Sequence, residues 1–348
     1  MKDSQELTKL ILLHDEEVNL SSISEETLSH IYVNFALLIT VMDFIKEQFW
    51  LNNKSEDSRS YESFLEELFL THLRSLSFLE KYIIERKSEG IKAISKKAKR
   101  VEKEITNEVM RRSSTERKSI LVRSLKLMDT HFQDEESLQV GRLQSLGHLG
   151  LNLYRTFDRI DDLFSFNYSL DQEMIIDASE KERLYEGAGV GVQSGYSTIL
   201  LALHRIKPKK GAKIIDLGSG YGRVGLVCSL LRSDIDFIGY EFVPHRVDIS
   251  IKACKDLSLE KSLRFFVQDL SDPSFKIPFA DIYYLYDPFT KETYDYVLEQ
   301  IIEYSRGNQV TVVTKGNAKG WLDKLSVDND WCLPEYIDEG NIGIYRSK

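Results

Sequence analysis

The chain has 348 residues and a formal net charge of −9, which is enough length for about two domains, each with its own core. With 42% hydrophobic residues, 29% charged residues and only 6 prolines, its composition excludes a disordered or collagen-like protein. The 3 cysteines are far apart and show no Cys-x-x-Cys spacing, which argues against a disulfide framework and for a reducing compartment. The 7 histidines show no paired ligand spacing, and we expect no metal site.

The N-terminal residues 1–18 lack the basic stretch and the long apolar core of a signal peptide. Residues 27–42 and 187–204 are uncharged, but polar residues or glycines interrupt both stretches, and both fall short of the ~20 apolar residues that span a bilayer. We therefore expect a cytoplasmic protein without a membrane contact, in which residues 27–42 form a buried core helix.

The two halves of the chain differ in texture. All 6 prolines lie at or beyond Pro208, and 15 of the 19 glycines lie from residue 187 on. In the first half, apolar residues recur at helical spacing. This periodicity predicts helices over 25–51, 61–83, 89–112, 116–132 and 136–164. Ser22 with Glu25 three residues later predicts a capping box at the start of the first of these. The sequence thus predicts an all-α domain over residues 1–170 and a second domain over 171–348.

In the second half, short β-branched and aromatic segments alternate with helical ones. These segments lie at 213–217, 237–241, 263–268, 281–287 and 309–314. Such alternation predicts βαβ crossovers and a parallel sheet. Two further segments, 334–337 and 342–346, are too close for a helical crossover and predict a C-terminal antiparallel hairpin. We therefore expect an α/β fold for this half.

The first of these predicted strands runs into a glycine-rich loop and then into a helix. Glycines let the backbone turn tightly and approach a ligand, and the helix start offers free amides and a positive dipole end. Gly220-x-Gly222-x-x-Gly225 matches the dinucleotide fingerprint, in which an acid about 20 positions later binds a ribose. In a nicotinamide enzyme, however, the strand would run directly into the first glycine, which would leave Asp216 without a role.

The longer pattern Asp216-x-Gly218-x-Gly220-x-Gly222 resembles the first motif of class I S-adenosylmethionine (SAM) methyltransferases, in which the acid lies by the methionine part of the cofactor. The resemblance covers about residues 185–348. It implies a Rossmann-like, seven-stranded sheet, with the hairpin supplying an inserted antiparallel strand, and it implies SAM as the cofactor.

The resemblance also implies cofactor contacts at the ends of the next strands. Glu241 ends the second strand, where a carboxylate accepts both ribose hydroxyls. Phe242 would cover the adenine face, and Asp269 after the third strand would accept the adenine amino group. Ligands of open α/β sheets bind outside the carboxyl ends of the strands, and these acids fall there in order.

Asp287-Pro288-Phe289 ends the fourth strand, where the family places its catalytic motif. It resembles the Asp/Asn-Pro-Pro-Tyr/Phe motif of amino-group methyltransferases, in which the side chain and a proline carbonyl hold the N–H and the aromatic ring packs on the target. Here one proline stands in place of two.

The first motifs, from Asp216 to Glu241, resemble those of non-SET protein-lysine methyltransferases. We expect methyl transfer from SAM to an amine, with a protein lysine as the favoured acceptor. A nucleic-acid or small-molecule amine is the alternative acceptor, and a non-catalytic SAM-binding regulatory protein is the alternative class.

Three further features carry predictions. Residues 81–126 hold 15 Lys and Arg against 6 Asp and Glu, which fits a nucleic-acid contact, a partner or homo-oligomer surface, or a solvated helix face. Asp158, Asp161 and Asp162 are expected at a solvated helix end, with a contact for a basic substrate as the alternative. The segment before the first motif is either an interdomain linker or a cover that contacts cofactor or substrate; its candidate side chains are Tyr185, Glu186 and Gln193.

Overall fold

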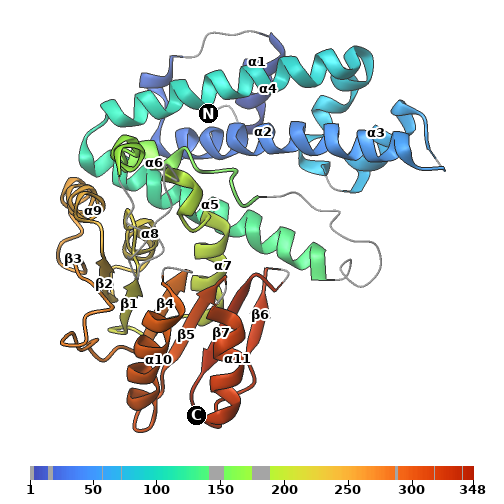
Figure 1. Ribbon diagram of the computed structural model, residues 1–348. Coiled ribbons are helices and arrows are strands. Elements are labelled where there is room, and N and C mark those ends of the chain that lie inside the picture. Colours follow the sequence, from blue (N-terminus) through green and yellow to red (C-terminus); the bar gives the residue numbers. More distant parts are fainter. Residues whose placement is uncertain are drawn as a thin grey trace. The chain divides into compact units, whose positions relative to one another are not determined.

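The computed structural model describes residues 4–14, 19–56, 58–71, 73–140, 153–174, 189–286, 289–316, 318–338 and 340–348. It divides the chain into two compact units, Met1–Arg159 and Ile160–Lys348, called here the helical unit and the sheet unit (Figure 1). The division lies N-terminal to the boundary predicted at residue 170, because the side chains of Asp161 and Asp171 bond to residues of the sheet unit.

The helical unit is built around one long apolar helix, α2. Its elements are α1 (Ser4–His14), η1 (Leu20–Ser22), α2 (Glu25–Lys54), α3 (Tyr61–Thr71), η2 (Arg74–Leu79), α4 (Glu80–Arg111) and α5 (Ser114–Val140). α4 and α5 pack on α2, and the side chains of Leu28, Ile31 and Phe35 are fully buried. The predicted core helix over 27–42 is confirmed.

By length and composition, α2 is nevertheless long and apolar enough to cross a membrane, although the sequence analysis judged its apolar stretch too short to do so. It is the one such helix among the described residues, and 67% of its most apolar eighteen-residue window is buried. That burial is what a core helix requires, because its apolar side chains are already packed against the neighbouring helices.

Three predicted helix boundaries are wrong. Ser24 caps α2, because its Oγ accepts the N–H of Thr27 at 3.2 Å, whereas Ser22 ends η1. The stripe predicted as one helix over 61–83 is divided into α3, η2 and the start of α4. α3 ends where the N–H of Leu73 bonds to the carbonyl of Leu68, five residues back. α5 continues without a break to Val140, and the next twelve residues lie outside the described part.

The sheet unit contains a seven-stranded sheet in the order β3-β2-β1-β4-β5-β7-β6. Its strands are β1 (Lys213–Leu217), β2 (Asp236–Glu241), β3 (Leu263–Val267), β4 (Ile282–Tyr286), β5 (Thr311–Lys315), β6 (Glu335–Ile337) and β7 (Ile342–Arg346). The first five pair in parallel, and β7 runs antiparallel to both β5 and β6. The predicted parallel sheet and closing hairpin are both confirmed.

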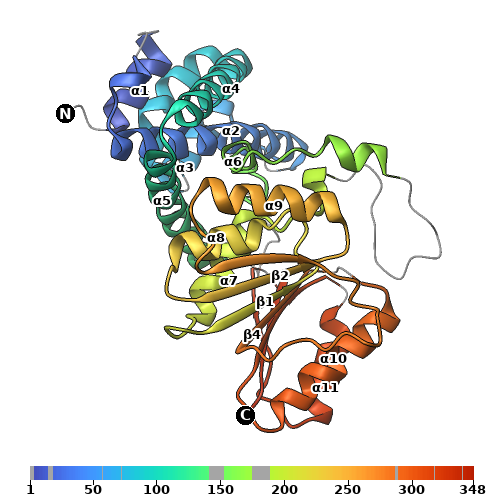
Figure 2. The same ribbon diagram turned by 90° about the vertical axis from the view of Figure 1, so that its left-hand side faces the viewer.

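Helices cover both faces of this sheet (Figure 2). The helices of the sheet unit are α6 (Ile160–Leu163), η3 (Ser169–Glu173), η4 (Gly189–Val192), α7 (Tyr196–Ile206), α8 (Arg223–Leu231), α9 (Pro244–Asp256), α10 (Lys291–Ser305) and α11 (Ala318–Asp328). α8 and α9 lie on one face, and α10 and α11 on the other. Ile215 and Leu217 of β1 join the core beneath α10 and α11, so that Asp216 between them faces the other side.

The strand order reverses at β1, with β2 and β3 on one side of it and β4 and β5 on the other. In an open α/β sheet, a ligand binds in the crevice at such a switch point, outside the carboxyl ends of the strands. The glycine-rich loop follows β1 and therefore lies at this position.

Candidate functional site

The loop between β1 and α8 has the backbone conformation that its glycines permit. Gly218, Gly220 and Gly222 all have positive φ, at 88°, 55° and 79°. The N–H groups of Gly218 and Ser219 both donate to the carbonyl of Tyr240 on β2, at 2.9 and 2.8 Å. These bonds hold the loop against the end of β2, so that its remaining amides and the start of α8 face the switch point.

Glu241, the last residue of β2, is bound directly to this loop. Its Oε2 accepts the N–H of Gly220 at 2.8 Å, and its Oε1 accepts the N–H of Val243 at 3.1 Å. Burial raises the pKa of Glu241, while the charge of Arg246, 3.6 Å from Oε1, and the two N–H donors act in the opposite direction. A carboxylate has roughly four acceptor positions, so this oriented side chain still has capacity to bind a vicinal diol.

Asp216 lies beside Glu241 and is almost completely buried. Its Oδ2 has no hydrogen-bond partner within the described residues. Burial, and then the charge of Glu241, hold the pKa of Asp216 well above its usual 3.8. A buried carboxyl oxygen without a hydrogen bond lowers the stability of a folded protein. A ligand that brings a hydrogen-bond donor or a cation would remove this destabilisation.

The space above the glycine loop is nearly filled by protein side chains. A cavity of about 30 Å³, room for about one water molecule, lies there. Its lining residues are Gln193, Ser194, Asp216, Gly218, Ser219, Gly220, Arg223, Val224, Tyr284 and Tyr286. Gln193 is buried, and its side-chain amide lies 3.2 Å from where a Cβ on Gly220 would stand. The segment before the first motif therefore covers the loop at Gln193, as one of the two sequence interpretations expected.

Asp161 is not at a solvated helix end, and that expectation is wrong. It is 3% exposed, and its carboxylate accepts the Nε of Arg223 at 3.0 Å and the hydroxyls of Tyr168 and Tyr196 at 2.6 and 2.7 Å. Arg223 also donates from Nη1 to the carbonyl of Ser194 at 2.8 Å. Thus the residue that begins α8 holds the segment that covers the glycine loop. Asp162 is exposed, as expected, and Asp158 pairs with Arg155 in the helical unit.

A second buried ion pair, between Arg246 and Asp171, lies next to Glu241. Arg246 donates from Nε and Nη2 to the two oxygens of Asp171 at 3.1 and 3.2 Å, and His245 Nε2 lies 2.9 Å from the same carboxylate. Burial alone would raise the pKa of Asp171, but the bonds from His245 and Arg246 outweigh it and lower that pKa. Sequence reasoning missed Asp171, Arg223 and Arg246, and no local pattern marks Asp171, because its partners come from α9.

Three other predicted site residues, Phe242, Asp269 and Phe289, differ in how far they are buried. Phe242 is half-buried directly after Glu241, and Asp269 is exposed, where its Oδ1 accepts the N–H and hydroxyl of Ser271 at 2.8 and 2.6 Å. The ring of Phe289 lies in the core against Tyr294, with centroids 5.1 Å apart, so it does not face an acceptor as the motif interpretation expected.

Four predicted positions, Tyr185, Glu186, Asp287 and Pro288, lie outside the described residues. Among the described residues, no group of three or more His, Cys, Asp or Glu could hold a metal ion.

The sheet order distinguishes the two ligands that the glycine loop allowed. A dinucleotide-binding sheet has the order 3-2-1-4-5-6 in parallel, whereas here the antiparallel β7 lies between β5 and β6. The sheet unit therefore has the Rossmann-like, seven-stranded fold that the resemblance to class I methyltransferases implied.

No protein-family model and no curated protein sequence matches the chain. Solved structures do match it. An RNA methyltransferase from Salinibacter ruber in complex with S-adenosyl-L-homocysteine shares 20% identity, with a TM-score of 0.36, over 44% of this chain and 92% of that one. Precorrin-6y C5,15-methyltransferase from Geobacter metallireducens shares 9% identity, with a TM-score of 0.36, over 45% and 90%. TrmN from Thermus thermophilus shares 15% identity, with a TM-score of 0.35, over 43% and 47%. At such identities the fold rests on the strand order itself, and the function on the residues of the site.

Proposed function

We propose that the protein is a SAM-dependent methyltransferase whose cofactor binds at the carboxyl edge of β1 and β2. The main support is the contact between Gly220 and Glu241 beside the unsatisfied Oδ2 of Asp216. The carboxylate of Glu241 and a buried acid whose Oδ2 has no hydrogen-bond partner among the described residues both lie at this glycine loop. This arrangement suits a ligand with a ribose at one end and an ammonium group at the other.

Each residue of the site has a role in this proposal. Glu241 accepts the ribose hydroxyls, and Asp216 accepts the ammonium group of the methionine part. Phe242 and Asp269 contact the adenine, as the resemblance implies. When bound, SAM supplies a methyl group on a sulfonium, so the protein mainly has to orient the acceptor and keep its lone pair free.

The proposed acceptor is an amine. Asp287 and the carbonyl of Pro288 would hold its N–H, and Tyr286, which lines the cavity above the glycine loop and precedes Asp287 in the sequence, would contact it. A protein lysine remains the favoured acceptor by the resemblance of the first motifs. A nucleic-acid amine is the second candidate, because α4 carries an exposed row of lysines, described below.

Calorimetric titration with SAM tests the cofactor site. Glu241→Ala should weaken SAM binding by about 1.5–3 kcal/mol, or about 10- to 150-fold, because it removes charged hydrogen bonds to the ribose. Glu260→Ala is the matched control, because Glu260 is exposed just before the amino end of β3. NAD should not compete with SAM. Equal affinities of Glu241→Ala and wild type would refute the assignment.

Transfer of a labelled methyl group tests the acceptor. The full-length protein is incubated with methyl-labelled SAM and a cell lysate, and portions are then digested with protease or nuclease. Protease-sensitive label supports a protein acceptor, and nuclease-sensitive label supports the second candidate. Asp287→Ala should retain SAM binding and lose transfer. SAM binding without any transfer to macromolecules would contradict both acceptors and favour a SAM-binding regulatory protein.

A further inference from the structure

One face of α4 carries a row of four exposed lysines. Lys92, Lys96, Lys99 and Lys103 are separated by four, three and four residues, which places them in one narrow stripe along the helix. All four side chains are exposed. Within the described part of the chain, none of them has an ion pair or a hydrogen bond. We call this row the lysine stripe.

The fold keeps the lysine stripe on the surface. The opposite face of α4 is apolar and packs into the helical unit, mainly against α2. Its buried residues include Ile91, Ile94, Ala98, Val101 and Ile105. Because these side chains fix the rotation of the helix, the four ammonium groups point outward. At 1.5 Å per residue, the stripe is about 16 Å long.

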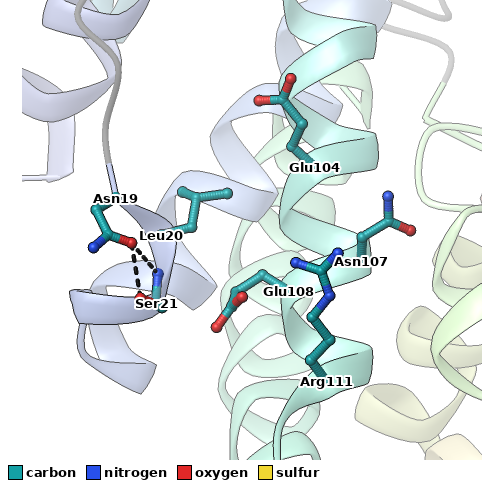
Figure 3. A pocket seen from close by; sticks show the side chains of 7 residues that line it. All are labelled: Asn19, Leu20, Ser21, Glu104, Asn107, Glu108 and Arg111. Carbon is teal, nitrogen blue, oxygen red and sulfur yellow. Dashed lines mark hydrogen bonds between the residues drawn. The ribbon is translucent and has the colours of Figure 1, made fainter.

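Two cations near the stripe differ from it because they are paired. Arg100 lies 3.6 Å from Glu104 on α4, and Arg112, the residue that caps the end of α4, lies 3.0 Å from Glu108. Beyond Lys103, the helix lines a hollow of about 440 Å³ with Glu104, Asn107, Glu108 and Arg111, and Asn19, Leu20 and Ser21 line its other side (Figure 3). Within the described residues, the stripe is therefore a row of exposed cations without an ion pair, in a protein whose net charge is −9.

We infer that the lysine stripe is a docking surface for the phosphate backbone of a nucleic acid. A row of exposed cations matches a polyanion, and about 16 Å along one nucleic-acid strand offers roughly five phosphates, about one for each lysine. An amphipathic helix that lies in a membrane surface buries an apolar face beside its cations, whereas the apolar face of α4 is already buried within the helical unit. This inference goes beyond the proposed function, because binding through the stripe needs neither SAM nor methyl transfer.

Fluorescence anisotropy with a labelled single-stranded RNA of mixed sequence, without SAM, tests the inference. The affinity of the full-length protein should fall linearly on a double-logarithmic plot against salt concentration. Replacing all four lysines with Gln retains the helix propensity and should reduce the slope by about 2.8, since each phosphate contact with a single strand contributes about 0.7. Between about 50 and 200 mM salt, the four lysines then account for about 50-fold of the affinity lost.

The matched control removes four exposed lysines from the sheet unit, as Lys209→Gln, Lys255→Gln, Lys261→Gln and Lys324→Gln. It changes the net charge equally and should leave the salt slope unchanged.

Three outcomes would overturn the inference. They are no RNA binding at low salt, an equal loss of slope in the control variant, and equal displacement of the RNA by poly-glutamate or by phosphatidylserine vesicles. Circular dichroism of both variants verifies that α4 remains folded. Because the measurement contains no SAM, its failure leaves the proposed methyltransferase activity untouched.

Discussion

Arg223 and Asp161 form a buried ion pair although 62 residues separate them in the chain. Their side chains are 1% and 4% exposed. Arg223 begins the helix after the glycine loop, and Asp161 lies on the short helix α6 that opens the sheet unit. The pair therefore ties the start of the sheet unit to the position where the cofactor is proposed to bind.

Asp161→Ala should lower the free energy of unfolding by about 3–5 kcal/mol, because it leaves the buried guanidinium of Arg223 without a counter-charge. Asp236→Ala is the control: it breaks an exposed pair with Arg264 and should cost under about 1 kcal/mol. Urea denaturation measures both changes. Similar losses in the two variants would show that the buried pair contributes no more than a surface one.

The stability of the protein without ligand should depend on the protonation of Asp216. Its pKa is raised in the folded state, so the folded protein holds this proton more tightly than the unfolded chain. The resulting stabilisation is complete below the unfolded pKa, near 4, and is lost as pH rises through the folded pKa. Asp216→Asn cannot ionise, and its free energy of unfolding should fall less above about pH 4 than that of the wild type.

Denaturant unfolding at a series of pH values measures this difference. Asp248→Asn, which replaces an exposed carboxyl on α9, should retain the wild-type pH dependence. If Asp216→Asn and the wild type follow parallel curves, Asp216 is ionised in the folded protein and its proposed environment is wrong.

Two glycine-to-alanine substitutions should change the stability of the protein in opposite directions. At Gly222 the φ is +79°, and a Cβ would stand 2.5 Å from the ring of Phe265. Gly222→Ala should therefore destabilise the protein by at least about 2 kcal/mol, from overpacking and an unfavourable backbone conformation. Gly320→Ala on α11 meets nothing within 4 Å and should stabilise it by about 0.5–1 kcal/mol. Thermal unfolding compares them, and a stable Gly222→Ala protein would contradict the tight packing of the loop.

Gln193 should limit the entry of the cofactor. Its buried side chain lies over Gly220 in a cavity with room for about one water molecule, so the side chain has to move before a ligand binds. Gln193→Ala should accelerate SAM association in stopped-flow fluorescence, and it should also accelerate dissociation because a covering contact is lost. Gln309→Ala, at an exposed position before the amino end of β5, is the control. An unchanged association rate would show that Gln193 does not obstruct the site.

Local patterns predicted most of the sheet unit. The alternation of β-branched runs and helices predicted the five parallel strands, and the short loop before residue 342 predicted the hairpin. The glycines at positive φ and the acids after successive strands depend on short-range chemistry, which is why Asp216, Gly220 and Glu241 could be placed together in advance. Helix boundaries were harder to predict, because a continuous apolar stripe over 61–83 does not reveal where the backbone turns.

Local periodicity and the direction of parallel strands are enough to predict the succession of strands, the glycine loop and the carboxyl edge at which its acids gather. Which polar side chains are buried together depends instead on tertiary packing. The sequence predicts Asp161 in a solvated acidic cluster, whereas in the structure it is buried with Arg223. The sequence predicts Phe289 as a contact for the acceptor, whereas its ring packs in the core against Tyr294. Burial and pairing depend on residues far apart in the chain, and no local pattern encodes them.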